Sequence, residues 1–218
     1  MTDTITIIDY NAGNIRSVQR ACSEIGAKAS VTCDPAEIDE AGRIIFPGVG
    51  AAPSAMASVK ETGVDAALTR AFEKGVPILG ICIGAQIILD RSEEGDQICL
   101  GLIQGTTRRF NLTDKSLKIP HMGWNEVKPV RPHPLLNGIE PGDEFYFVHS
   151  YFPQPNNNEY VYAVTDYGID FCSALGYRNL FATQFHPEKS GNLGLKLLER
   201  FTSWDGQSPD ESVPGKGD

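Results

Sequence analysis

Leu79-Gly80-Ile81-Cys82-Ile83-Gly84-Ala85-Gln86 joins a strongly apolar run at 77–81, typical of a buried strand, to a helical stretch that begins near Gly84. Gly80 and Gly84 flank Cys82 at the spacing of a nucleophile elbow, a tight turn between a strand and a helix. The backbone of the nucleophile is strained there. Side chains two residues before and after it would collide with the neighbouring strand and helix, so both positions need glycine. The pattern predicts a strand–turn–helix unit with Cys82 as its candidate nucleophile.

The elbow also predicts how Cys82 would react. The turn places Cys82 at a helix N-terminus, whose partial positive charge favours the attacking thiolate. The N–H of Ile83 points towards a developing oxyanion. The competing interpretation is an inert, buried cysteine at a glycine-rich strand end, because most buried cysteines are unreactive. Unrelated α/β hydrolases and thiol proteins share this elbow, so the motif alone leaves both interpretations open.

Strands and helices alternate in the first half of the chain. Short apolar or β-branched runs predict strands at 4–9, 28–32, 43–46 and 77–81. Helical spacing predicts helices at 14–25 and 64–74, and Asp34-Pro35 reads as a helix cap followed by proline at the first helical position. This rhythm predicts an α/β fold with a mainly parallel central sheet and helices on both faces.

The second half predicts antiparallel additions to the same sheet and then a closing helix. The expected strands are 101–110, 124–127, 144–148, 160–165, 171–177 and 180–184, and the helix is 192–203. From Asp205 the chain is rich in Gly, Pro, Ser and acidic residues, with Val213 as its one aliphatic side chain. We therefore expect one domain over 1–204 and a disordered acidic tail over 205–218.

A candidate base follows the last predicted strand, in Gln184-Phe185-His186-Pro187-Glu188. Thiol chemistry needs an imidazole that takes the cysteine proton and later returns it to a leaving amine. Glu188 can fold back across Pro187 to orient His186 and stabilise its imidazolium form. The alternative is a loop histidine beside a solvated glutamate. Together with the elbow, the pair favours a Cys82–His186–Glu188 triad.

Composition excludes several classes of protein. The 218 residues carry a formal net charge of −9, which argues against nucleic acid or an anionic membrane surface as the main partner. The five cysteines form no CxxC pair, so we expect neither a disulfide framework nor a zinc site, but reduced thiols in a cytoplasmic protein. We also expect no signal peptide and no membrane span, since the stretch 75–89 is broken by Pro77 and several glycines.

Together these motifs resemble the class I, or triad, glutamine amidotransferases. The matching segments are Pro47-Gly48-Val49-Gly50, 80–86 and His186-Pro187-Glu188. The resemblance implies the flavodoxin-like fold of that family and hydrolysis of the side-chain amide of L-glutamine without a metal or organic cofactor. The ammonia would pass, unexposed, to a separate synthase site.

Longer strings resemble one branch of the family, the glutaminase subunits of imidazole glycerol phosphate synthases. They are 119–125 (IPHMGWN), 9–18 (DYNAGNIRSV), 145–151 (FYFVHSY) and Lys189-Ser190. The resemblance implies a heterodimer with a (β/α)8-barrel cyclase, which forms imidazole glycerol phosphate and an aminoimidazole carboxamide ribotide in histidine biosynthesis. A paralogue that supplies another synthase, or a catalytically silent scaffold, remains an alternative.

Roles for further residues follow from the same resemblance. The N–H groups of Val49 and Ile83 would form the oxyanion hole. The expected substrate-binding residues are Gly48, Gly50, Gln86, Glu94, Ser150 and Tyr151. The expected partner-interface residues are Trp124, Asn125, Tyr146 and Lys189. Simpler interpretations are a satisfied core amide for Gln86, a solvated charge for Glu94 and a core aromatic for Trp124.

Overall fold

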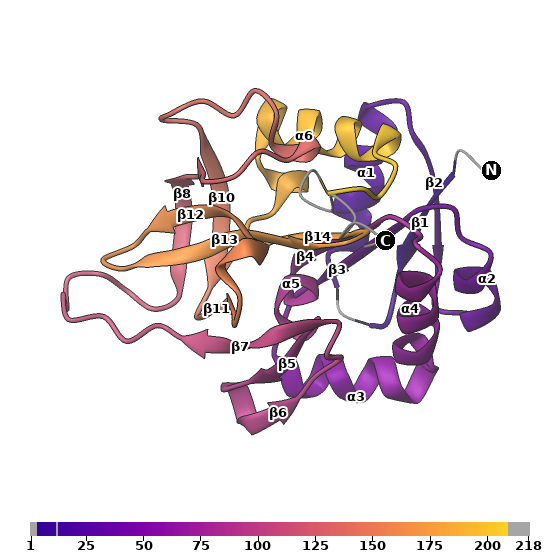
Figure 1. The fold of residues 1–218 in the computed structure, drawn as a ribbon, viewed down its shortest axis with the longest axis horizontal. Coiled ribbons are helices and arrows are strands. Elements are labelled where there is room, and N and C mark those ends of the chain that lie inside the picture. Colours follow the sequence, from indigo (N-terminus) through magenta and orange to yellow (C-terminus); the bar gives the residue numbers. More distant parts are fainter. Residues whose placement is uncertain (1–3, 12, 209–218) are drawn as a thin grey trace, which may run out of the picture.

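Parallel strands form the centre of the fold. The computed structural model describes residues 4–11 and 13–208, and Figure 1 shows a central sheet with helices on both sides. The parallel strands, in spatial order, are β2 (Lys28–Thr32), β1 (Thr4–Ile8), β3 (Ile44–Gly48), β4 (Ile78–Cys82) and β14 (Leu180–Thr183). The register of β3 and β4 pairs Gly48 with Cys82. Both residues therefore lie at the carboxyl ends of the strands, where open parallel sheets bind their ligands.

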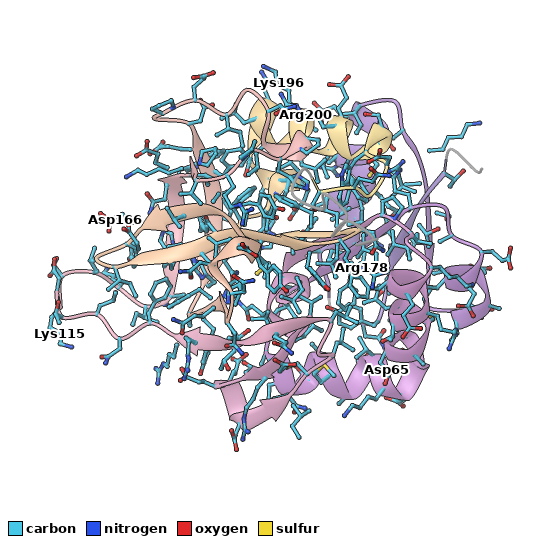
Figure 2. The ribbon with its side chains drawn as sticks, in the orientation of Figure 1. Asp65, Lys115, Asp166, Arg178, Lys196 and Arg200 are labelled. Atoms are coloured by element: carbon cyan, nitrogen blue, oxygen red, sulfur yellow. The ribbon has the colours of Figure 1, made fainter. Side chains whose placement is uncertain are left out.

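Helices cover both faces of this sheet, as predicted. On one face lie α1 (Ile15–Glu24) and α6 (Gly191–Ser203), and on the other α2 (Pro35–Asp39), α3 (Ala52–Thr62), α4 (Val64–Glu73) and α5 (Ile83–Ile87). Figure 2 shows Lys196 and Arg200 on the outer side of α6, while Leu197 and Leu198 are buried. The sequence did not predict α3, because its buried side chains are mostly small.

Alternation along the strands divides the core into two layers. Ile44 and Phe46 pack with α2, α3, α4 and α5, whereas the intervening Ile45 packs with α1 and α6. Successive side chains of a strand point to opposite faces, so one apolar run fills both layers. This is the physical reason why a fully apolar strand, rather than an alternating one, indicated a sheet covered on both sides.

The antiparallel additions differ in part from expectation. Three strands extend the main sheet beyond β14: β13 (Asp170–Tyr177), β12 (Val161–Asp166) and β9 (Lys128–Pro129). Others form a separate sheet in the order β11 (Tyr151–Pro155), β7 (Ile103–Arg109), β5 (Leu89–Ser92), β6 (Gln97–Ile98). A further pair joins β8 (His121–Glu126) and β10 (Glu144–His149). The small sheets stay separate because aromatic side chains fill the space between them, with ring centroids of Phe110 and Phe147 5.3 and 5.8 Å from that of Phe171.

Short 3-10 turns connect several of these elements. They are η1 (Glu94–Asp96), η2 (Pro134–Leu136), η3 (Asn158–Tyr160) and η4 (Pro187–Lys189). After α6 the chain stays packed on the body, because Trp204 Nε1 donates to Gln207 O at 2.9 Å and Ser208 Oγ to Arg178 O at 3.0 Å. The packed segment thus extends to residue 208, four residues beyond the predicted end of the domain at 204. The rest of the predicted tail, 209–218, lies outside the described residues. Within the described ranges, no helix is both long and apolar enough to cross a membrane.

Candidate active site

Cys82 stands at the junction of β4 and α5 with a positive φ of 55°, which is rare outside glycine. A Cβ atom at Gly84 would lie 1.9 Å from the carbonyl oxygen of Phe46, and one at Gly80 would lie 3.0 Å from Cβ of Ala182. Strand β3 therefore excludes a side chain at Gly84, and β14 leaves only a tight fit for one at Gly80. The elbow predicted from the sequence is present, and for the steric reason given there.

His186 and Glu188 form a buried pair beside this elbow. His186 Nδ1 lies 2.7 Å from Oε1 of Glu188, and neither side chain is exposed to solvent. Asn14 Nδ2 donates a hydrogen bond of 2.5 Å to the same carboxylate oxygen. Asn14 was not expected in the site, although it belongs to the DYNAGN string, because the 174 residues that separate it from Glu188 hide the contact.

The electrostatics of the pair favour a charged imidazole. Burial alone would lower the pKa of His186, but the neighbouring Cys82 sulfur and the Glu188 carboxylate both favour the protonated ring and raise its pKa to about 10. His186 Nε2 is buried and makes no hydrogen bond with any described residue. A protonated imidazole beside a thiolate is the arrangement that thiol nucleophiles require.

A cavity of about 260 Å³ opens onto Cys82. Its walls are formed by Val49, Gly50, Cys82, Ile83, Gln86, Glu94, Pro120, Val148, His149, Ser150 and Tyr151. Seven of the expected oxyanion and substrate residues meet here with the nucleophile, and Gly48 lies just behind the wall. The volume is near the lower end for ligand pockets, which suits a small, polar molecule. Among the described residues, no group of three His, Cys, Asp or Glu side chains is placed to hold a metal ion.

Gln86 is tied to the pocket wall by both hydrogens of its amide. Nε2 donates to Tyr151 O at 2.9 Å and to Gln184 Oε1 at 3.0 Å. Gln184 Nε2 in turn donates to Cys82 Sγ at 3.6 Å. Both N–H groups of the Gln86 amide are thus hydrogen-bonded, as in a core amide. The side chain nevertheless lines the cavity, so its Oε1 is the atom that can accept a hydrogen bond from a ligand N–H. The sequence did not single out Gln184.

Glu94 and its neighbour Glu93 have different environments. Glu94 lines the cavity, and its Oε2 accepts a hydrogen bond of 2.7 Å from Ala52 N at the start of α3. Glu93 instead forms a surface ion pair with Arg108 at 2.7 Å and accepts from Arg109 N. Glu94 is therefore no ordinary solvated charge, and it combines a helix cap with a negative charge in the cavity.

The predicted oxyanion loop runs from the end of β3. Its Gly48 approaches Tyr10 so closely that a Cβ atom would lie 2.2 Å from the Tyr10 hydroxyl, and only glycine fits. That hydroxyl is fully buried and makes no hydrogen bond with the described residues, so burial raises the pKa of Tyr10 well above its usual value. After Asn14 and Gln184, Tyr10 is a third residue of the site that the sequence did not identify.

Three of the four expected interface residues lie together. Trp124 is 53% exposed, so it is not a core aromatic, and its ring centroid lies 6.1 Å from that of Tyr146. Lys189 Nζ lies 5.8 Å from the centroid of the same Tyr146 ring. Asn125 points to the opposite face of β8, because neighbouring side chains of a strand alternate, and its Nδ2 donates to Asp166 O at 2.9 Å.

Comparisons with known proteins identify relatives of this chain. The model of the family "Glutamine amidotransferase class-I" matches residues 6–203. The chain is 50% identical over 202 residues to "Imidazole glycerol phosphate synthase subunit HisH" of Nitratidesulfovibrio vulgaris (strain DP4), covering 90% of this chain and 94% of the relative. It is 46% identical over 213 residues to the protein of the same name from Desulfovibrio desulfuricans, covering 95% and 98%.

Solved structures share the fold at much lower identity. PurLQS from Thermotoga maritima superposes with a TM-score of 0.72 at 20% identity, over 93% of this chain and 99% of that chain. The glutaminase domain of CTPS from Trypanosoma brucei superposes with a TM-score of 0.62 at 16% identity, over 95% and 97%. At such identities the likeness concerns the fold alone.

Proposed function

This chain belongs to the class-I glutamine amidotransferase family, and from that membership we propose that it is the glutaminase subunit of an imidazole glycerol phosphate synthase. It is thus an enzyme that releases ammonia from glutamine. One observation carries the proposal for the site: Cys82 lines a cavity together with the amide of Gln86 and the carboxylate of Glu94, and the buried His186–Glu188 pair lies next to this cysteine. A carboxylate, an amide and a nucleophile suit the ammonium, carboxamide and reacting carbon of a free amino acid.

In the proposed reaction, the Cys82 thiolate attacks the carboxamide carbon of glutamine. A C–S bond forms, and the carbonyl electron pair moves to oxygen. The oxyanion accepts hydrogen bonds from the N–H groups of Ile83 and of a turned Val49, each worth about 2.7–4 kcal/mol in the transition state. His186 gives its proton to the departing nitrogen, the C–N bond breaks, and ammonia leaves behind a glutamyl thioester.

Hydrolysis of the thioester completes the cycle. The now neutral His186 takes a proton from water, the water oxygen attacks the thioester carbon, and the C–S bond breaks. Glutamate departs, and Cys82 is again a thiolate beside a protonated His186. Glu188 holds the ring through Nδ1 in both halves, so that Nε2 alone exchanges protons.

The proposal includes a cyclase partner that receives the ammonia. The exposed Trp124 and Met122, with Tyr146 and Lys189, form an apolar and cationic surface suited to a protein interface. The (β/α)8-barrel form of the partner, the ammonia channel and the heterodimer follow from the resemblance. A cytoplasmic compartment belongs to the same proposal, because a thiol nucleophile must stay reduced and all five cysteines are free.

A coupled assay tests the proposal. Purified chain and cyclase are mixed with glutamine and the cyclase substrate, and both glutamate and imidazole glycerol phosphate are measured. We expect Cys82→Ala to lose glutamate formation at least about a thousandfold yet to keep synthesis driven by added ammonium salts. Cys22→Ala, a buried cysteine on α1, is the matched control and should keep both activities.

Three outcomes would overturn the proposal in different ways. Unchanged glutamate formation by Cys82→Ala would remove the assigned nucleophile. Glutaminase activity that no histidine-pathway cyclase stimulates, together with co-purification of another synthase, would favour the paralogue. A wild-type chain that binds the cyclase without hydrolysing glutamine would be the silent scaffold.

A further inference from the structure

Behind the cavity wall runs a chain of hydrogen bonds that the proposed reaction does not use. His149 lines the cavity, and its Nδ1 lies 2.8 Å from Tyr151 O. Its Nε2 lies 2.9 Å from Nδ1 of His121, its register partner in the β8–β10 pair. Figure 1 shows these two strands side by side. His121 Nε2 lies 3.3 Å from Nδ2 of Asn125. Asn125, His121 and His149 together are called the relay below.

The two ends of the relay impose one direction on it. Tyr151 O can only accept, so His149 must carry its hydrogen on Nδ1 and accept at Nε2. At the other end, Asn125 Oδ1 accepts from Glu126 N at 2.8 Å and Nδ2 donates to Asp166 O, which fixes the orientation of the amide. His121 must therefore accept at Nε2 and donate from Nδ1. The hydrogen bonds at the two ends therefore agree: each ring carries its hydrogen on Nδ1 and accepts at Nε2.

Burial keeps both rings neutral, as these roles require. His121 and His149 are 3% and 5% exposed. Burial lowers the pKa of His121 to about 4 and that of His149 to about 3. The His121 ring is stacked between Phe147 and Tyr167, with centroids 4.9 and 4.0 Å away. The ring thus cannot turn out of the relay without breaking two stacking contacts.

The relay ends on the carbonyl that also holds Gln86. Tyr151 O accepts from Gln86 Nε2 and from His149 Nδ1, so two donors from different elements converge on one oxygen. We propose that His149 is a positioning residue of the glutamine pocket, held by His121 and Asn125, which fixes the Tyr151 carbonyl and through it the amide of Gln86. The identity of the substrate in this inference rests on the proposed function, whereas the hydrogen bonds of the relay are independent of it.

A matched pair of variants tests the role. The side-chain nitrogen of asparagine overlays Nδ1 of histidine and can donate to Tyr151 O, whereas leucine has nearly the same shape and cannot. In the complex with cyclase and its substrate, we expect His149→Leu to raise KM for glutamine about tenfold, the loss of roughly one hydrogen bond, with a smaller change in kcat. His149→Asn should restore most of the affinity. His133→Leu, at a buried histidine that does not line the cavity, should leave KM unchanged.

Equal KM values for His149→Leu and His149→Asn would overturn the inference, as would an unchanged KM for both. A second measurement needs no activity and no variant. With 15N-histidine, NMR should show both rings with hydrogen on Nδ1 and a coupling across the hydrogen bond from His121 Nδ1 to His149 Nε2. A ring protonated on Nε2 would overturn the relay. An inactive wild type with the expected spectrum would instead count against the proposed function alone.

Discussion

The carboxylate of Glu188 lies 2.7 Å from Nδ1 of His186, and both side chains are sealed from solvent. Two residues that are almost adjacent in sequence thus form a charge-assisted pair in a low-dielectric setting, where such hydrogen bonds are strongest. Asn14, the N-cap residue just before α1, supports the pair by donating to the same oxygen.

Glu188→Gln should impair catalysis without preventing glutamine from binding. The amide removes the charge that helps to keep the His186 pKa high, so that pKa falls. We expect kcat for glutamine hydrolysis to drop roughly 10²–10⁴-fold. The alkaline limb of kcat/KM should also move to lower pH, because the imidazolium is lost earlier. Glu199→Gln, on the exposed face of α6, is the control, and an unshifted limb would contradict the assigned role.

Glu94→Gln should weaken the binding of glutamine without lowering the stability of the fold. Glutamine retains an oxygen that can accept from Ala52 N, so the cap of α3 is kept and the free energy of unfolding changes little. The cavity loses its negative charge, and KM for glutamine should rise about tenfold or more, the value of one charged hydrogen bond. The adjacent Glu93→Gln removes a surface ion pair and should leave KM alone. Equal effects at the two positions would speak against ammonium binding by Glu94.

Gly84→Ala should destabilise the fold strongly. Its new methyl group would lie 1.9 Å from the Phe46 carbonyl, which is backbone and cannot turn aside. Overpacking of this kind costs about 1–3 kcal/mol or more in the free energy of unfolding. Gly26→Ala has open space and only its positive φ of 73° to oppose it, so it should cost about 1 kcal/mol. Urea titrations compare the two, and similar midpoints would contradict the steric account.

Stability should fall in mild acid, in part because of His133. This ring is 1% exposed, is stacked on Phe181 with centroids 4.1 Å apart, and accepts from Leu135 N. Burial lowers its pKa to about 3 from an ordinary value of 6.5. Between these pH values the unfolded chain binds a proton that the folded chain refuses, so stability is lost as pH falls from 6.5.

The contribution of His133 can be isolated from that of other groups. It amounts to at most about 1.4 kcal/mol per pH unit. His133→Phe lacks the group, and its free energy of unfolding should depend less on pH between 4 and 6.5 than that of the wild type. Parallel pH dependences of the two proteins would rule out this linkage. Chemical denaturation at several pH values provides the measurement.

The sequence by itself determined the structural features that depend on local steric constraints and short spacings. Glycines at 80 and 84 around Cys82 predicted the elbow, because a tight strand-to-helix turn leaves little or no room for side chains there. Continuous apolar runs predicted a sheet covered on both faces. The two-residue spacing of His186 and Glu188 predicted their hydrogen bond, since one 3-10 turn returns the carboxylate to the ring.

Tertiary structure alone decided the contacts between distant segments. Asn14 reaches Glu188, Glu94 caps α3, and His149 meets His121 only after strands far apart in the chain are paired in a particular register. Hydrophobic periodicity tells which face of a strand is buried, but not which strand becomes its neighbour. That choice depends on how large aromatic side chains such as Phe171 fill the space between sheets, and it separated the small sheets from the main one.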